Sequence, residues 1–489
     1  MSKLASLAAE ALCRDPASAA VEFEGRWHSW GDLAQVAQGI DAALAASGIA
    51  PDAPVAFVPR NRPSSLAALL ALIAQGRTIR MVYAFQSPAG IARDLLARDV
   101  VAVIADARDF GPEVRAALAD RGLAAVALGD TDAAPLAGFE RGSVKASAPA
   151  QPSIEILTSG TTGPPKPFAV SYALIEEHFL ASPLARQHAV ANAPPFLLYF
   201  PLGNISGLYS TLPMLLGGQR MTLLERFTLE GWHDHVVRYR PAHTGLPPAC
   251  LQQVLDADIP RADLASIKAL GTGAAPLDPA VQSAFEDRYG IPVLLSYGAT
   301  EFAGPVAMMT AELHRDWGRA KLGSVGCALP GVSLRVVDAD SGAVLPPGVE
   351  GVLEVIAPRI GHDWIRTSDL ALIDADGFLF HRGRADGAIV RGGFKIVPES
   401  VESALRLHPA VSEAVVVGFP DRRLGEIPVV AIRLAPGVAT PSIAALETHL
   451  RKHVLAPHVP VKWLFCNELP RTPSLKTDRS AVKRLFNGN

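Results

Sequence analysis

Apolar and polar residues follow two different periods along the first half of the chain. Apolar residues recur at helical spacing over Asp32–Ala46, and Val55–Val58 follows as a short buried strand. Leu66–Ala74 predicts a buried helix, and Val100–Ile104 predicts another strand. The alternation continues as far as Leu277–Tyr289. Strands that alternate with helices in this way predict parallel α/β layers.

The pattern changes after Gly323. Three short strands separated by glycine-containing turns predict an antiparallel β unit, at Val332–Val337, Gly351–Ile356 and Phe378–Arg382. Beyond Pro398 a helix, two strands and a second helix predict a small α+β domain, at Glu399–Leu407, Ala414–Val417, Val429–Leu434 and Ser442–Val454. Two glycines among charged residues, Gly383–Gly387, mark the expected junction before it.

Composition narrows the class of protein. The 489 residues are 49% hydrophobic and 19% charged, which is typical of a globular protein with a sizeable core. A net charge of -3 gives no indication of a nucleic-acid partner. The four cysteines are scattered and predict reduced thiols rather than a zinc site. The longest apolar run is too short to cross a bilayer, and the N-terminus does not resemble a signal peptide, so we expect a cytoplasmic enzyme.

One short segment, Leu157–Lys166, is rich in hydroxyls and glycine and ends in a lysine. Hydroxyls donate hydrogen bonds, glycine permits close backbone approach, and lysine adds positive charge, so the segment suits a polyphosphate. It lacks the spacing of a P-loop, and an ordinary surface loop is the alternative. The candidate phosphate-binding residues are Thr158, Ser159, Gly160, Thr161, Thr162, Gly163 and Lys166.

A second cluster, Ser296–Glu301, follows the apolar strand Pro292–Leu295. Strand ends are where α/β sheets place ligands. Tyr297 offers a flat face to a base, Thr300 a hydroxyl, and Glu301 a carboxylate able to hold Mg²⁺. A solvent-facing turn is an equally simple explanation of this cluster taken alone.

Four further segments carry candidate chemistry, each with a plainer alternative. The small-residue loop Gly271–Pro276 permits close approach to a ligand, although tight packing explains such loops nearly as often. Thr367–Asp369 offers a carboxylate to ribose hydroxyls or forms an ordinary turn. Arg384 and Asp386 are candidate functional residues at the domain junction, and a surface ion pair is the plainer alternative. Lys476, in the stretch Pro470–Arg479, is catalytic or merely solvated.

The order and spacing of these six segments are more informative than any one of them. Together they resemble the adenylate-forming superfamily of acyl-CoA synthetases, adenylation domains and luciferases, over essentially the whole chain. The resemblance implies a large N-terminal domain of stacked α/β layers with a β-barrel-like subdomain over 1–383. It also implies a hinge at 384–386 and a small mobile α+β C-terminal domain over 387–489.

Such enzymes join a carboxylic acid to the α-phosphate of ATP and then pass the acyl group to a thiol. The resemblance implies that Lys476, Thr300 and Glu301 act in catalysis, with Glu301 as the Mg²⁺ ligand. Asp386 would be the hinge residue. Besides the phosphate segment, the implied ATP- and AMP-binding residues are Gly273, Ala274, Ala275, Ser296, Tyr297, Gly298, Asp369 and Arg384.

For the acyl pocket the resemblance implies mostly apolar or small residues: Tyr199, Asn204, Gly207, Gly271, Phe302, Ala303 and Gly304. No fixed acidic residue is expected there, which favours an uncharged fatty or aromatic acid. Asp234, His235 and His243 are the nearest polar candidates, with structural or solvated roles more common. The chain departs from the family at Asn204, where acyl-CoA synthetases commonly have histidine, and also at Ser368, Gly387 and Leu475.

The expected activity is an ATP-dependent acid–CoA ligase, with ATP, Mg²⁺ and CoA. The thiol side would involve Gly393, Phe394 and Lys395, and the basic residues Arg391, Lys462 and Arg471 lean towards CoA. Three alternatives stay open. The acceptor is a carrier-protein phosphopantetheine, the adenylate goes to no thiol at all, or the fold binds nucleotide or acyl groups without catalysis.

Overall fold

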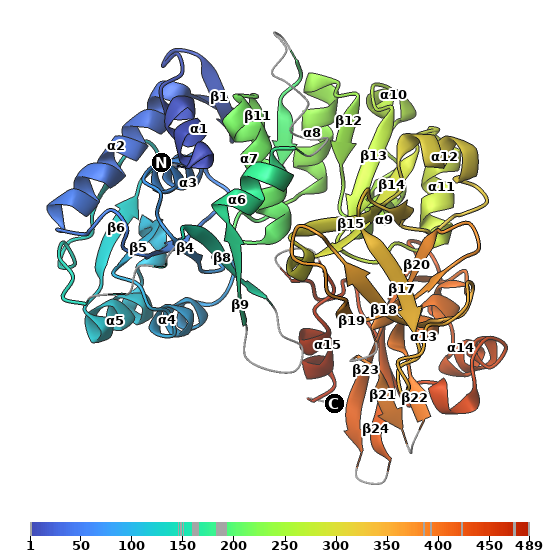
Figure 1. Ribbon diagram of the computed structural model, residues 1–489. Helices are drawn as coiled ribbons and strands as arrows, with labels where there is room; N and C mark the ends of the chain where they lie inside the picture. The colour runs from blue at the N-terminus through green and yellow to red at the C-terminus, as the bar shows by residue number, and fades with distance from the viewer. Residues whose placement is uncertain are drawn as a thin grey trace. The chain divides into compact units, whose positions relative to one another are not determined.

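The computed structural model describes residues 2–144, 146, 149, 151–158, 166–181, 193–384, 387–391, 394–421, 424–472 and 476–487. The chain forms two compact units (Figure 1). The first comprises Met1–Thr244 and Ala299–Gly304, and the second Gly245–Gly298 and Pro305–Asn489. The expected boundary at 384–386 falls within the second unit and stays a prediction.

A seven-stranded sheet forms the centre of the first unit. Its order is β7-β6-β5-β3-β4-β8-β9, and the inner strands are parallel, as the alternating pattern predicts. The edge strands β7 and β9 run antiparallel to their neighbours. The bounds are β3 Val55–Val58, β4 Ile79–Met81, β5 Ala102–Asp106, β6 Ala124–Leu128, β7 Ala133–Pro135, β8 Ser153–Thr158 and β9 Lys166–Ser171.

Helices cover both faces of this sheet (Figure 1). Successive residues of a strand point to opposite faces. Phe57 and Ile104 therefore pack with α1 (Lys3–Leu12), α2 (Trp30–Ala46) and α3 (Pro63–Ala74), in one core cluster. Their strand neighbours Ala56 and Val103 pack with α4 (Pro88–Leu96) and α5 (Pro112–Arg121), in another.

A smaller four-stranded sheet, β10-β11-β1-β2, completes the first unit. Its strands are β1 Ala19–Phe23, β2 Arg26–Ser29, β10 Phe196–Leu198 and β11 Met221–Leu223. The remaining helices of this unit are α6 Tyr172–Leu174, η2 Ile175–Phe179, α7 Ile205–Gly217 and α8 Leu229–Tyr239. Among the helices of the described residues, none is both long and apolar enough to cross a membrane.

The second unit begins with a five-stranded sheet, β12-β13-β14-β15-β16. The expectation that Gly271–Gly273 form a loop and that Ser296–Ala299 follow a strand is wrong. Both segments lie within strands, because Leu270–Gly273 pair with Val293–Ser296 in a parallel ladder. Glycine at 273 permits this pairing, since a Cβ built there would lie 2.6 Å from Ser296 Oγ. The elements are β12 His243–Gly245, α9 Pro248–Asp256, α10 Arg261–Leu264, β13 Ala269–Gly273, α11 Pro279–Tyr289, β14 Val293–Ala299, β15 Gly304–Met308, α12 Ala311–Trp317 and β16 Cys327–Ala328. The turn η3 Thr300–Phe302, between β14 and β15 in the sequence, belongs to the first unit.

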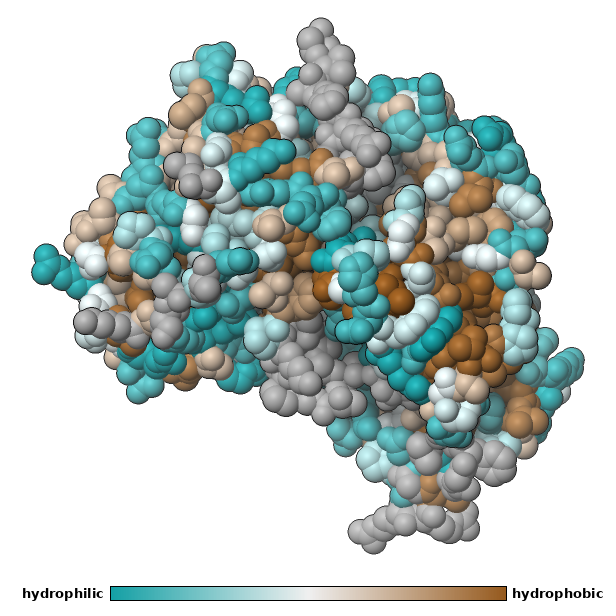
Figure 2. Space-filling model, in the orientation of Figure 1, coloured by the Kyte–Doolittle hydropathy of each residue, from teal (hydrophilic) through white to brown (hydrophobic). Residues whose placement is uncertain are grey.

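An antiparallel sheet of order β17-β18-β19-β20 follows. The turn pattern predicts β17, β18 and β20 but not β19. The strands of this sheet are β17 Ser333–Val337, β18 Gly351–Ile356, β19 Ile365–Ile373 and β20 Leu379–Arg384. Asp369 therefore lies in a strand, and the alternative that it belongs to an ordinary turn is wrong. Figure 2 shows hydrophobic residues on the face of the second unit that β17 and β18 occupy in Figure 1.

The C-terminal part is the expected α+β assembly. Its sheet has the order β22-β21-β24-β23, with β25 beside β24. The helices α13 and α14 pack on one face and α15 on the other. The bounds are β21 Ile389–Arg391, β22 Phe394–Ile396, α13 Pro398–Arg406, β23 Val411–Asp421, β24 Gly425–Leu434, α14 Ile443–Leu450, η4 Ala456–His458, β25 Lys462–Phe465 and α15 Arg479–Leu485.

Candidate active site

The second unit brings together three of the residues predicted to bind nucleotide. The hydroxyl of Tyr297, in β14, donates to Asp369 Oδ2 at 2.5 Å. Arg384, in β20, lies opposite Asp369 in the ladder with β19, and its Nη1 is 4.0 Å from Asp369 Oδ1. An aromatic ring, a carboxylate and a guanidinium therefore face one another at the predicted adenine and ribose positions.

A β-bulge in β20 creates this arrangement. Ala371 pairs with His381, whereas Leu370 pairs with Gly383, so Arg382 is one extra residue in the ladder. Without the bulge, Arg384 would lie opposite Ser368 and point to the other face of the sheet. The Arg384 guanidinium also donates to Ser368 Oγ at 2.5 Å, so the serine that departs from the family pattern helps to hold the arginine.

The electrostatics of the cluster keep Asp369 charged. Burial alone would raise the pKa of Asp369, but hydrogen bonds from His381 and Tyr297 and the charge of Arg384 hold that pKa below its usual value. Burial and the neighbouring carboxylate raise the pKa of Tyr297, so its hydroxyl stays protonated and remains a donor. A charged, oriented acceptor of this kind suits ribose hydroxyls.

The backbone at the C-terminal end of β13 is accessible to a ligand. Ala274 has φ +64°, a left-handed conformation, and it is exposed. Gly273, the last residue of β13, pairs with Ser296, and Thr272 Oγ1 donates to the carbonyl of Leu246 at 2.7 Å. Gly273, Ala274 and Ala275 therefore lie at a strand end held by a buried hydroxyl, whereas Gly271 and Gly298 lie inside strands.

The phosphate segment is described only at its ends. Thr158 ends β8, Lys166 begins β9, and the two residues pair in the antiparallel ladder. Residues 159–165, with the predicted Ser159, Gly160, Thr161, Thr162 and Gly163, lie outside the described residues.

Thr300 and Glu301 form a 3-10 turn in the first unit. Glu301 is exposed, while Phe302 and Ala303 are buried. A single accessible carboxylate fits Mg²⁺ bound chiefly by phosphate oxygens and water. Within the described parts of the chain, no cluster of three or more His, Cys, Asp or Glu could form an all-protein cation site.

Two predicted acyl residues, Asn204 and Gly207, lie at the start of α7, and a third, Gly304, lies beside Tyr209 of the same helix. Asn204 caps this helix, its Oδ1 accepting from Gly207 N–H at 2.7 Å. A Cβ on Gly207 would lie 2.0 Å from the carbonyl oxygen of Pro201, so glycine is required there. A Cβ on Gly304, which has φ +126°, would lie 3.2 Å from the Tyr209 ring.

Aromatic rings and one buried amide hold the neighbouring segment. Tyr199 packs against Phe200 and Phe227, with ring centroids 4.4 and 5.2 Å away. Asn61 is fully buried; it donates to the carbonyls of Phe200 and Leu224 and accepts from Leu202 N–H. No sequence motif marks Asn61; its only signal is a polar residue within a buried stretch.

The polar candidates near this region have structural or solvated positions. His235 is 1% exposed, packs against Tyr239, and burial lowers its pKa to about 4. Asp234 pairs with Arg238 one helical turn away, at 3.4 Å, and His243 is exposed. The plainer alternatives fit these three residues.

The backbone of Lys476 is held by Thr472 in the second unit. Its side chain is exposed, its N–H donates to Thr472 Oγ1 at 3.1 Å, and its carbonyl accepts from Thr472 N–H at 2.7 Å. Arg479, which follows in α15, donates to Glu399 Oε1 at 2.8 Å and also pairs with Glu402. The predicted catalytic lysine therefore extends from a segment tied to α13.

The basic residues considered for CoA mostly have partners of their own. Arg391 donates to the carbonyl of Pro457 at 2.5 Å, Lys462 lies over the Phe419 ring, and Arg471 pairs with Glu413. Phe394 and Lys395 belong to β22, where only the backbone is described. Gly393 and the predicted hinge residue Asp386 lie outside the described residues.

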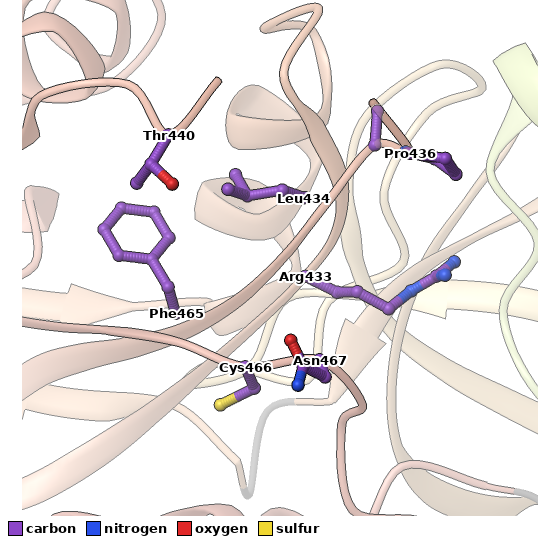
Figure 3. A pocket seen from close by; sticks show the side chains of 8 residues that line it. Arg433, Leu434, Pro436, Thr440, Phe465, Cys466 and Asn467 are labelled. Carbon is purple, nitrogen blue, oxygen red and sulfur yellow. The ribbon is translucent and has the colours of Figure 1, made fainter. Parts of the chain in front are cut away.

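A cavity of about 410 Å³ lies in the C-terminal part of the second unit (Figure 3). Its lining includes Arg433, Thr440, Phe465, Cys466 and Asn467 and contains none of the predicted site residues. Arg433 is already paired with Glu413 and Asp256, and burial raises the pKa of the Cys466 thiol. The cavity therefore has no unused charge to recognise a ligand.

Known proteins resemble this chain over nearly its full length. Sulfoacetate–CoA ligase of Cupriavidus necator is 29% identical, over 92% of this chain and 91% of that protein. Indoleacetate–CoA ligase of Aromatoleum aromaticum is 29% identical, over 96% of each. Among solved structures, the amide bond synthetase McbA from Marinactinospora thermotolerans has a TM-score of 0.78 and 27% identity, over 99% of both chains.

Fold and sequence together define an adenylate-forming enzyme. The chain belongs to the AMP-binding enzyme family: the family model matches residues 8–361, and that of the AMP-binding enzyme C-terminal domain matches residues 400–476.

Proposed function

We propose that this protein is an ATP-dependent carboxylic acid–CoA ligase, which forms an acyl-adenylate with release of pyrophosphate and transfers the acyl group to the CoA thiol. The observation that carries the nucleotide half of this proposal is the Tyr297–Asp369–Arg384 cluster. Its charged carboxylate would accept hydrogen bonds from the ribose hydroxyls, and the Tyr297 ring would stack beside adenine.

The first reaction brings a carboxylate anion onto a polyanion, so the enzyme must neutralise developing negative charge. Thr300 would donate to the α-phosphate, and Lys476 would supply a mobile positive charge to the attacking carboxylate and that phosphate. Glu301 would hold the Mg²⁺ that offsets the charge of the phosphates. One lost donor in such a site typically costs roughly 3 kcal/mol of barrier, about a hundredfold in rate.

The acid is proposed to be an uncharged fatty or aromatic one. The segment from Tyr199 to Gly207 is aromatic, apolar or small and carries no charged side chain, and its amide, Asn204, accepts the N–H of Gly207 at the start of α7. A second carboxylate or a sulfonate on the substrate would need a fixed positive partner. The two related ligases act on an indole acid and a sulfonated acid, so identity alone does not choose between these classes.

Two other acceptors are kept as alternatives to CoA. One is a carrier-protein phosphopantetheine. The other is an amine, favoured by 27% identity over 99% of the chain to an amide bond synthetase. The internal partners of Arg391, Lys462 and Arg471 weaken the argument that these charges serve the CoA phosphates.

The test is pyrophosphate release with ATP and Mg²⁺ across a panel of free acids, each with CoA, with an amine, or with neither. Acid-dependent release with acyl-CoA formed only when CoA is present supports the proposal. Amide formation without acyl-CoA would replace it by the amine alternative. Release with neither product would favour a carrier protein, and no release with any acid would argue against the ligase.

A further inference from the structure

A histidine outside every predicted motif contacts the proposed ribose carboxylate. His381 Nε2 lies 3.4 Å from Asp369 Oδ1, and its ring lies beside Tyr297, with centroids 6.0 Å apart. Tyr297 donates to the other oxygen, Oδ2. One carboxylate is thus contacted on both oxygens by side chains from two different sheets.

The bulge at Arg382 explains how His381 and Arg384 share this carboxylate. In a regular strand, residues at this spacing point to opposite faces of the sheet. Here His381 pairs with Ala371, and Arg384 pairs with Asp369, two residues of β19 that share a face. The extra residue between them therefore turns both side chains towards Asp369. Gly383 permits the bend with φ +124°.

The chemistry of the cluster gives His381 a defined task. A carboxylate rotates readily about its terminal torsion unless its oxygens are bound. Each oxygen has lone pairs for two hydrogen bonds, so Tyr297 and His381 can bind one each and leave acceptor capacity for a ligand. Asp369 is 14% exposed and His381 20%, so the pair is accessible to a ligand while largely shielded from water.

We propose that His381 is a positioning residue of the nucleotide site. Its Nε2–H donates to Asp369 Oδ1 and, together with Tyr297, fixes the carboxylate plane for the ribose 2′- and 3′-hydroxyls. The inference rests on the proposed function, because it requires Asp369 to bind ribose. His381 acts through Asp369 and need not touch the nucleotide.

The experiment compares AMP with 2′,3′-dideoxyAMP, which lacks both hydroxyls, by calorimetric titration. The proteins are the wild type, His381→Leu, His381→Gln and the control His362→Leu, which alters an exposed histidine. The wild type and the control should bind AMP at least tenfold more tightly than dideoxyAMP. In His381→Leu that ratio should fall about tenfold, while dideoxyAMP affinity stays unchanged. His381→Gln keeps an N–H donor and should restore most of the ratio.

Each other outcome overturns the inference. If His381→Leu weakens both nucleotides equally, with a lower melting temperature, the histidine serves only the fold. If the ratio in His381→Leu equals that of the wild type, the contact has no role in positioning. If the wild type shows no preference for AMP, the assignment of Asp369 to ribose fails, and the proposed function loses its main support as well.

Discussion

The Tyr297 hydroxyl and Asp369 Oδ2, 72 positions apart in the sequence, lie 2.5 Å from each other. This hydrogen bond links the C-terminal end of β14 to β19 of the antiparallel sheet. It also joins a residue that the family resemblance assigns to adenine with one assigned to ribose. Binding of adenine and binding of ribose are therefore both expected to depend on this hydrogen bond.

Tyr297→Phe tests that contact, because it removes the hydroxyl and keeps the ring. A hydrogen bond to a charged group contributes about 1.5–3 kcal/mol, so we expect AMP affinity to fall at least tenfold. Tyr239→Phe is the matched control: it removes another hydroxyl bound to a carboxylate, that of Glu22. Equal AMP affinity in Tyr297→Phe and wild type, measured by titration, would contradict the prediction.

Two glycines of α7 form a matched pair. Gly207→Ala would place a methyl group 2.0 Å from the Pro201 carbonyl, whereas Gly217→Ala meets no atom within 4 Å. We expect the first to destabilise the protein by more than about 2 kcal/mol and the second to stabilise the helix by up to about 1 kcal/mol. Thermal and urea unfolding measure both, and similar stabilities would refute the steric argument.

Asn204 separates a structural role from a role at the substrate. Asn204→Ala removes the helix cap and should lower the free energy of unfolding by about 1 kcal/mol, whereas Asn204→Asp should keep it. If Asn204 also borders the substrate carboxylate, the added negative charge of Asn204→Asp should raise the KM for the acid severalfold. An unchanged KM would confine Asn204 to capping.

Lys476→Ala should slow acyl-adenylate formation by about a hundredfold or more, while transfer from supplied acyl-adenylate stays within a fewfold of wild type. The positive charge of Lys476 is needed at the α-phosphate while the adenylate forms. It is not needed for transfer of the acyl group to the thiol. Lys483→Ala, a nearby lysine in α15 whose Nζ lies 3.9 Å from Glu426, is the control. An equal loss of both half-reactions would show that the assigned role is wrong.

The buried His235 should make the free energy of unfolding fall in mild acid. Burial lowers its pKa from 6.5 to about 4, with Glu22 and Arg238 as its charged neighbours. The unfolded chain binds this proton first as the pH falls below 6.5, so stability is full above 6.5 and declines towards pH 4. Between pH 6.5 and 5 the loss is roughly 2 kcal/mol. Urea unfolding of His235→Leu should show a smaller loss, and the exposed variant His243→Leu should match wild type.

Several elements could be predicted from local pattern. β18 has the predicted bounds, Gly351–Ile356, because turn-forming residues limit it on both sides. β23 was predicted as Ala414–Val417 but extends over Val411–Asp421. Its ends carry polar residues such as Glu413, which lack an apolar signal and are held by pairing with β24. Pairing between distant segments thus decides what local periodicity does not.

The site shows the same division. Asp369 and Arg384 could be predicted as candidates because their motifs are local. The bulge that turns them towards each other could not, since it depends on the register of β19 against β20. His381 and Asn61 were missed for this reason: their partners, Asp369 and the Phe200 segment, come together only in the folded chain.

The bulge also bears on how related sequences should be compared. Deleting Arg382 would leave a regular ladder in which His381 still pairs with Ala371 and Arg384 with Asp369. A chain with one codon fewer would therefore present the same nucleotide-facing side chains, while an alignment without a gap would put its histidine against the wrong position. Gaps at this strand end should be placed by ladder pairing, so that loss of the histidine during evolution is not confused with a neutral change in length.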